Sequence, residues 1–227
     1  MAVKYHYDIE QGTDAWHQLR CGILTCSEVR LIITPTLKVA SNDKERQHLY
    51  ELLSQRVTSY TEPQYISDSM LRGHVDEIEA RQIYNDTYEP VTECGFVTND
   101  DHGFMLGYSP DWLVGDNGQG ECKSRMGKYQ AQTIVEGKCP EDFILQVQSG
   151  LIVTKREWCD FTSFCAGMPM VTIRVFPDQV VQDAIIDAAG KFEERLQKKM
   201  ESYFENIMTM RVVPTERKID HGEEIVL

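Results

Sequence analysis

The alternation of apolar and polar residues divides the chain into a helical first part and a strand-rich remainder. Within residues 12–33, apolar side chains recur at helical spacing in two short runs. Thr25 and Glu28 stand just before the second run, at the spacing of a capping box that opens a helix. Two short helices are therefore predicted here, the second one beginning at this box.

Two longer helices are predicted to follow. Asn42 or Asp43 is suited to cap a helix that runs through Ser59. Another long helix is predicted over residues 67–85. Together these elements make a helical part at about residues 1–88.

Beyond this part, short runs rich in β-branched and aromatic residues alternate with turn residues, a pattern that is typical of strands. The sequence GDNGQG at residues 115–120 predicts a hairpin turn, and GECKS at residues 120–124 predicts the returning strand. The remaining predictions are strands within residues 90–100, 103–109, 111–115, 157–167 and 170–176, helices at about 128–137 and 141–153, and a last helix from Pro177 and Asp178 to about Asn206.

This order of elements predicts a mixed α/β or α+β fold with one central mixed sheet flanked by helices. A length of 227 residues with 41% apolar composition suits a single domain, which ends in a polar tail at about residues 209–227. No run of about 18 apolar residues predicts a membrane span, and the first residues lack the pattern of a signal peptide. We therefore expect a cytoplasmic protein without a membrane partner.

The formal net charge of −13 argues against a protein that coats nucleic acid by bulk attraction. It does not exclude a DNA enzyme, because a local basic lining can still guide a strand. The seven cysteines form no CxxC pair and no regular framework, which indicates reduced thiols in or near the core. Their spacing does not support an iron–sulfur cluster of the kind that some nucleases carry.

The most informative stretch is GYSPDWLVGDNGQGECKS, residues 107–124. Side chains alternate along a strand, so Glu121 and Lys123 share one face while Cys122 points to the other. A hairpin would bring Asp111 beside Glu121. Two such carboxylates repel each other unless a cation lies between them or one is protonated, and hard oxygen ligands suit Mg²⁺ or Mn²⁺.

These groups are the parts of metal-assisted phosphodiester hydrolysis. The backbone carbonyl of Cys122 could complete the inner shell, and Lys123 would lie beside the attacking water or the scissile phosphate. A solvated cross-strand ion pair is the structural alternative. An EF-hand does not fit, because apolar residues follow Asp111 where acids are needed, and a glycosidase acid pair leaves Lys123 without a role.

Pro110-Asp111 followed by Glu121-x-Lys123 is the signature of the PD-(D/E)xK nuclease superfamily, and longer blocks narrow the resemblance. DAWHQLRCGILTCSEV at residues 14–29, SPDWLVGDNGQGECK at residues 109–123 and LQVQSGLIVT at residues 145–154 resemble, in the same order, the blocks of phage lambda exonuclease-type nucleases. This group includes the alkaline exonucleases and YqaJ-like viral recombinases. The resemblance covers residues 14–154 and implies a phage or prophage origin, in the cytoplasm of a bacterial host.

The resemblance implies roles for the residues of the motif. Asp111 and Glu121 match the Mg²⁺ ligands of the family, with the carbonyl of Cys122 as a backbone ligand. Lys123 matches the lysine that acts on the nucleophilic water.

Two further residues match positions near the family's metal site. Gln146 matches a glutamine that holds the nucleophile and the geometry of the site. Related helicase-nucleases have a tyrosine four positions later, where this chain has Gly150, so no tyrosine role is expected there. Glu77 aligns with a glutamate that contributes to the metal site, and an exposed helix acid is the alternative.

The N-terminal block implies a pocket that binds a 5′-phosphate. Arg20 and Ser27 match the pocket residues, and Ser109 could add a hydroxyl. We expect Ser27 in the first turn of a helix, where free N–H groups favour anions. Trp16 is either a core residue or a flank of the DNA path.

Met70 and Leu71 are apolar residues in a polar neighbourhood. In the family, an apolar side chain at this place wedges into the duplex and separates the last base pairs. Ordinary packing of the helix is the alternative.

The resemblance thus implies a Mg²⁺-dependent exonuclease that degrades one strand of linear double-stranded DNA from 5′-phosphorylated ends. It would release mononucleotides and leave 3′ single-stranded tails for a single-strand annealing protein. A ring-shaped homotrimer around the DNA is implied as well.

Two other functions stay open on the sequence. A site-specific endonuclease would need a helix that reads the major groove, and no such helix is obvious. A non-catalytic DNA-end-binding recombination mediator is disfavoured, because Asp111, Glu121 and Lys123 are all present.

Overall fold

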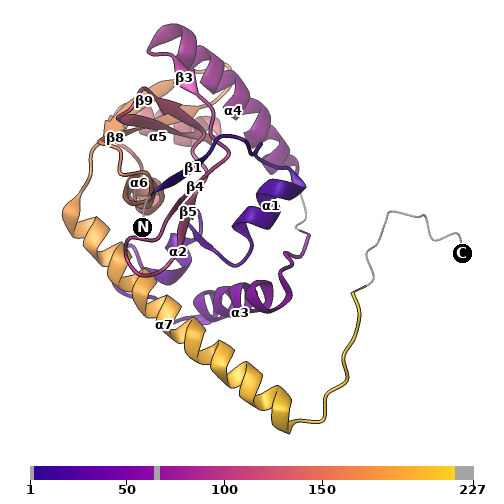
Figure 1. The fold of residues 1–227 in the computed structure, drawn as a ribbon. Coiled ribbons are helices and arrows are strands. Elements are labelled where there is room, and N and C mark those ends of the chain that lie inside the picture. Colours follow the sequence, from indigo (N-terminus) through magenta and orange to yellow (C-terminus); the bar gives the residue numbers. More distant parts are fainter. Residues whose placement is uncertain (1–2, 64–66, 218–227) are drawn as a thin grey trace, which may run out of the picture.

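A computed structural model describes residues 3–63 and 67–217, and these residues form a mixed α/β fold (Figure 1). The helices are α1 (Asp14–Arg20), α2 (Val29–Ile32), α3 (Asp43–Thr58), α4 (Asp68–Thr87), α5 (Gly127–Glu136), α6 (Glu141–Thr154) and α7 (Gln179–Thr209). The strands are β1 (Lys4–His6), β2 (Leu24–Thr25), β3 (Val91–Thr92), β4 (Phe96–Asn99), β5 (Leu106–Tyr108), β6 (Trp112–Val114), β7 (Gly118–Ser124), β8 (Trp158–Phe164) and β9 (Val171–Val175). The predicted fold class is confirmed.

The strands form two sheets instead of the single central sheet that the sequence suggested. One sheet has the order β1-β4-β5-β2 and the other β3-β6-β7-β8-β9. The chain passes from the first sheet to the second through Ser109, Pro110 and Asp111, between β5 and β6. Proline has no N–H to donate to a ladder, so Pro110 ends the pairing of β5 and releases the chain to the other sheet.

Parallel and antiparallel pairs are mixed in both sheets. β7 and β8 pair in parallel over their full length, while β6 with β7 and β8 with β9 are antiparallel. β7 is therefore a central strand with neighbours on both sides. Groups at its end lie at the middle of the sheet's edge, where helices α4, α5 and α6 approach.

Polar caps fix the starts of the two long N-terminal helices. The side chain of Asn42 accepts from the N–H of Glu45 at 3.0 Å, so Asn42 and not Asp43 caps α3. Ser67 caps α4 by accepting from the N–H of Met70. The starts of both helices agree with the prediction, because N-cap signals are local in sequence.

The capping box predicted at Thr25 and Glu28 forms only in part. Glu28 reaches back and accepts from the N–H of Thr25 at 3.1 Å, but the Thr25 hydroxyl donates to the Glu28 carboxylate instead of accepting from a helix N–H. Glu28 itself is the N-cap of α2, which is only four residues long. Ser27 consequently lies before the helix, and the prediction that it stands in the first turn is wrong.

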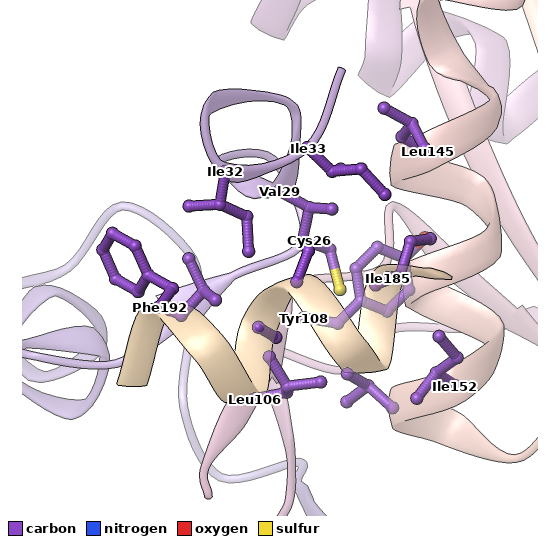
Figure 2. Close-up of a cluster of buried hydrophobic side chains, with 14 of the residues drawn as sticks. Cys26, Val29, Ile32, Ile33, Leu106, Tyr108, Leu145, Ile152, Ile185 and Phe192 are labelled. Atoms are coloured by element: carbon purple, nitrogen blue, oxygen red, sulfur yellow. The ribbon is translucent and has the colours of Figure 1, made fainter. Parts of the chain in front are cut away.

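The largest core lies where α2, α6 and α7 pack on β2, β4 and β5 (Figure 2). Its central side chains include Val29, Leu106, Ile152, Ile185 and Phe192, all of them buried. α7 runs along one side of the molecule next to α3, to which it is tied by ion pairs (Figure 1). The core therefore fixes α6, which carries residues of the candidate site.

The cysteines are all free thiols, and five of the seven are buried. Cys21 and Cys165 are the two that are partly exposed. This agrees with the prediction of reduced thiols in or near the core.

α7 ends at Thr209, three residues beyond the predicted end. Residues 211–217 of the predicted tail are exposed and have no regular secondary structure, and the rest of the tail lies outside the described residues. No helix in the described part of the chain is long and apolar enough to cross a membrane.

Candidate active site

The β6–β7 hairpin brings Asp111 to the side of Glu121. Trp112 pairs with Gly120 in the antiparallel ladder, so the residue before Trp112 meets the residue after Gly120. Asp111 Oδ2 accepts from the backbone N–H of Cys122. A Cβ at Gly120 would lie 2.0 Å from the ring of Trp112, so glycine leaves room for this ring over the neighbouring strand.

The alternation of β7 separates catalytic candidates from core. Lys123 Nζ lies 2.5 Å from Glu121 Oε1, which shows that both side chains share one face. Cys122 points to the other face, into a cluster with Ala80, Tyr84 and others. One strand therefore presents charge to one side and apolar packing to the other, as the alternation predicts.

Glu121 is 1% exposed and accepts from three side chains. Lys123 Nζ and Gln146 Nε2 donate to Oε1, the latter at 2.6 Å, and the hydroxyl of Tyr108 donates to Oε2 at 2.8 Å. Gln146 thus lies where the sequence placed it, against the carboxylate. Tyr108 was not predicted, because its place in an apolar strand reads as core and its hydroxyl gives no signal in sequence.

The carboxylates of the site repel each other. Burial and the nearby charges of Glu121 and Glu77 raise the pKa of Asp111 well above the ordinary value. Burial and the charge of Glu121 raise the pKa of Glu77. Burial lowers the pKa of Lys123, but the charges of Glu121 and Asp111 outweigh it and leave that pKa above its usual value. Three acids thus share one ammonium.

This donor set fits a hard divalent cation, although it is not a closed cage. Among residues 3–63 and 67–217, no three His, Cys, Asp or Glu side chains form a ready-made metal-binding group. Mg²⁺ needs only one or two carboxylates, since it keeps several waters. Added positive charge would relieve the repulsion that raises the pKa of Asp111, so Asp111 and Glu121 could hold such an ion.

The backbone of Cys122 faces the same place. Its N–H points to Asp111, and the N–H and C=O of one strand residue point toward the same neighbour. β6 begins at Trp112, so the ladder offers no partner on this side beyond Gly120. The Cys122 carbonyl is therefore directed to the same side of β7 as Asp111.

Helix α4 closes the site from the other side. Glu77 and Asp111 both line a cavity of about 510 Å³. Asp76, which the sequence analysis did not single out, accepts from the hydroxyl of Ser124 at the end of β7 and so fixes α4 to that strand. Glu77 is thereby placed beside the carboxylates and is not a remote surface acid.

Met70 and Leu71 lie in the first turns of α4 and are 52% and 55% exposed. Neither Met70 nor Leu71 therefore belongs to the core of the described residues. Their side chains are available at the surface.

A second cavity, of about 180 Å³, adjoins the carboxylates. It brings together Arg20, Ser27 and Ser109, the residues predicted for a phosphate pocket, and Gln146 reaches it from α6. Its full lining is Trp16, Arg20, Thr25, Cys26, Ser27, Tyr108, Ser109 and Gln146. Because Gln146 and Tyr108 also donate to Glu121, the two places share a wall.

Among the described residues, no acid lines the cavity that holds Arg20. Its Nη1 donates to Ser109 Oγ at 3.1 Å, and its Cζ lies 4.1 Å from the ring centre of Trp16. The indole N–H of Trp16 donates to Ser109 Oγ at 2.9 Å and to the carbonyl of Gly95 at 3.0 Å. Burial lowers the pKa of Arg20. Trp16 is thus half-buried support for a guanidinium, and the cavity suits an anion.

The chain matches the YqaJ-like viral recombinase domain over residues 15–157, more than half of its length. It is similar to an alkaline exonuclease (LHK-Exo) from Laribacter hongkongensis, with a TM-score of 0.76 and 29% identity over 86% of this chain and 98% of that chain. A complex of LHK-Exo with dAMP gives a TM-score of 0.75 and 30% identity, over 86% of this chain and 98% of that chain. A phage-related exonuclease from Haemophilus somnus shares the fold, with a TM-score of 0.54, 14% identity, and coverage of 78% and 96%. No curated protein matches the chain.

Proposed function

The chain belongs to the YqaJ-like viral recombinase domain family, and on this basis we infer that it is a DNA exonuclease. More specifically, we propose that it uses Mg²⁺, for which Mn²⁺ can substitute, to degrade one strand of linear double-stranded DNA from a 5′-phosphorylated end. The observation that carries this proposal is the wall shared by the cavity of Arg20 and the carboxylate of Glu121.

The Arg20 cavity would receive the terminal 5′-phosphate. The planar guanidinium offers paired donors to phosphate oxygens, and the hydroxyls of Ser27 and Ser109 add hydrogen-bonding groups. The next phosphate along the strand then lies at Asp111, Glu121 and Lys123. This order makes the first phosphodiester bond the scissile one, so each cleavage releases a mononucleotide.

Asp111, Glu121 and the carbonyl of Cys122, with Glu77 nearby, would hold the metal ion, and its positive charge would then act on the scissile phosphate and the attacking water. Without a metal ion, the charges of Glu121 and Asp111 outweigh burial and raise the pKa of Lys123. Its ammonium stabilises negative charge as it develops on the phosphate. Gln146 holds the orientation of Glu121 and contacts the terminal nucleotide from the cavity side.

The exposed pair Met70 and Leu71 would lie against the end of the duplex, where an apolar side chain separates the strands. The product is a 3′ single-stranded tail, which a single-strand annealing protein would use in recombination. We propose a homotrimeric ring as the assembly that retains the DNA, and the cytoplasm of a bacterial host as the place of action.

The experiment that tests this function is digestion of a linear duplex carrying a 5′-phosphate or a 5′-hydroxyl, in Mg²⁺ and in EDTA. We expect Mg²⁺-dependent release of mononucleotides, faster from the 5′-phosphate and abolished in Lys123→Ala. Arg20→Gln should remove the preference for phosphate while keeping cleavage of 5′-hydroxyl ends.

A closed circular duplex separates the alternatives. A site-specific endonuclease would cut the circle, and an end-binding protein would bind linear ends and cut neither substrate. An exonuclease cuts only the linear form.

A further inference from the structure

Cationic and aromatic side chains alternate along a path that begins at Lys123. The ammonium nitrogen of Lys123 lies 5.6 Å from the ring centre of Phe143, and the guanidinium carbon of Arg125 lies 5.0 Å from the same ring. Arg125 is also 5.1 Å from the ring centre of Tyr129, over which Lys128 Nζ lies at 4.7 Å. We call these five residues the cation–aromatic track.

The fold holds the track at the surface beside the site. The backbone N–H of Arg125 donates to the carbonyl of Phe164 at 2.7 Å, where β7 leaves the sheet. Lys128 and Tyr129 follow in the first turn of α5, and Tyr129 is 40% exposed. The track therefore runs from the half-buried Lys123 outward to solvent.

The two outer cations are not neutralised by acids. Within the described ranges, neither Arg125 nor Lys128 forms a salt bridge, and Arg125 Nε is buried without a hydrogen-bond partner. Several other arginines of this acidic chain are paired with acids, as Arg56 is with Glu193. Cations kept apart from carboxylates are free to contact phosphates.

Helix α6 places the track on the far side of the site from the Arg20 cavity. Gln146 lines that cavity and donates to Glu121, while Phe143 lies one helical turn earlier in the track. The cavity, the carboxylate of Glu121 and the track therefore follow one another along the helix.

We propose that the cation–aromatic track binds the cleaved strand on the 3′ side of the scissile bond. Arg125 and Lys128 would contact its phosphates, and Tyr129 would stack against a base. Such stacking tolerates any sequence, because every base has a π face, and it suits an enzyme that must move along DNA. This inference rests on the proposed function, in which the 5′ end lies at Arg20.

The other way out of the site is unfavourable for a phosphate backbone. The cavity of about 510 Å³ carries Asp8, Glu10 and Glu93 in its wall in addition to the carboxylates of the site. Arg81, the arginine in that wall, is paired with Glu93 at 3.2 Å. Like charge would repel the strand there, so the track is the complementary surface.

The first test compares the double variant Arg125→Gln/Lys128→Gln with Lys191→Gln/Lys198→Gln. The control removes the same charge from the exposed side of α7, where both lysines pair with acids one turn away. We expect kcat/KM of the track variant to fall about tenfold or more. The slope of log kcat/KM against log salt concentration should become shallower by about 0.9 per lost phosphate contact. The kcat at saturating DNA should change less than about threefold, since neither residue is part of the hydrolytic centre. A salt dependence equal to that of the wild-type protein would overturn the proposal.

The second test replaces phosphates of the DNA by uncharged methylphosphonates. Neutral linkages just beyond the scissile bond of the cleaved strand should lower the kcat/KM of the wild-type protein. They should have little further effect on the kcat/KM of the double variant. Additive losses, or the same pattern from the complementary strand, would contradict the assignment. A wild-type protein that hydrolyses no duplex would instead overturn the proposed function. Equilibrium binding of the same duplexes by the wild-type protein and the double variant would then show whether the track binds the strand.

Stacking is tested at Tyr129. Tyr129→Phe keeps the ring and should bind as the wild-type protein does, whereas Tyr129→Ala should raise KM about tenfold. Equal values for the two variants would exclude a base from this position.

Discussion

Arg156 donates from Nη1 to the carbonyl oxygen of Gly115 at 2.8 Å, and through this contact the loop after α6 is fixed to the β6–β7 turn. The same nitrogen also donates to the carbonyls of Val114 and Gly118. Arg156 is 8% exposed, so these contacts are inside the protein. The turn that sets Asp111 against Glu121 is thus held from behind.

We expect Arg156→Gln to destabilise the protein by about 2–4 kcal/mol, because buried carbonyls lose their donors. This corresponds to a fall in Tm of roughly 4–16 °C for a chain of this size. Nuclease activity should also fall at temperatures below the Tm, where the variant is still folded, because the hairpin loosens. Arg46→Gln, at an exposed arginine of α3, is the matched control and should change stability by less than about 0.5 kcal/mol. Equal melting curves for the two variants would contradict this role of Arg156.

Removing one charge at Asp111 should stabilise the metal-free protein. The pKa of Asp111 is raised in the folded state, so its contribution to stability is fully present below the ordinary carboxyl pKa and is lost as the pH rises through the raised one. Asp111→Asn has no such charge. In EDTA near pH 8 the variant should melt several degrees above the wild-type protein, and the difference should shrink toward pH 4.

Added Mg²⁺ should reverse this order of stability. It should raise the Tm of the wild-type protein and leave that of Asp111→Asn nearly unchanged, while the variant has no nuclease activity. Differential scanning fluorimetry over a pH series measures both effects. A variant that is less stable than the wild-type protein in EDTA at every pH would show that Asp111 is not under repulsion.

Tyr84→Phe should lower the free energy of unfolding by about 1–2 kcal/mol, because the Tyr84 hydroxyl donates to buried Asp160 Oδ2 at 2.6 Å. Arg174 donates to both oxygens of the same carboxylate, so Asp160 keeps partners and the fold is retained. Urea unfolding measures the change. Tyr88→Phe, at a tyrosine that is 52% exposed, is the control and should have no measurable effect.

Trp16→Phe should weaken the preference for 5′-phosphorylated ends about three- to tenfold. The phenyl ring still supports Arg20, but the hydrogen bonds from the indole N–H to Ser109 and Gly95 are lost. The rate on 5′-hydroxyl ends should be unchanged, which separates positioning from general damage. Trp158→Phe, whose ring packs under Arg174, should leave the ratio of the two rates as it is.

The parts of the site that could be predicted are those determined locally. The turn residues between Asp111 and Glu121 predict the hairpin directly. Alternation along one strand then decides that Glu121 and Lys123 share a face. Caps such as Asn42 and Ser67 are equally local. The family resemblance supplied the positions of Arg20 and Gln146, which the chain alone would not separate from ordinary surface and helix residues.

The parts that could not be predicted depend on contacts between distant segments. Arg156 binds carbonyl groups about forty residues earlier, and backbone carbonyls carry no sequence signal. Tyr108 reads as a core residue until its hydroxyl meets Glu121. The division into two sheets depends on what Pro110 does to pairing in three dimensions, and a linear strand pattern cannot show it.

The exposure of the thiols gives this protein a built-in pair of labelling sites. Cys21 follows Arg20 in the chain, and Cys165 follows Phe164, the residue whose carbonyl accepts from Arg125. Burial raises the pKa of Cys26 and of Cys139 to about 12, so these interior thiols react slowly with alkylating dyes. Fluorophores on the native chain would therefore report from both ends of the proposed DNA path, without any engineered cysteine.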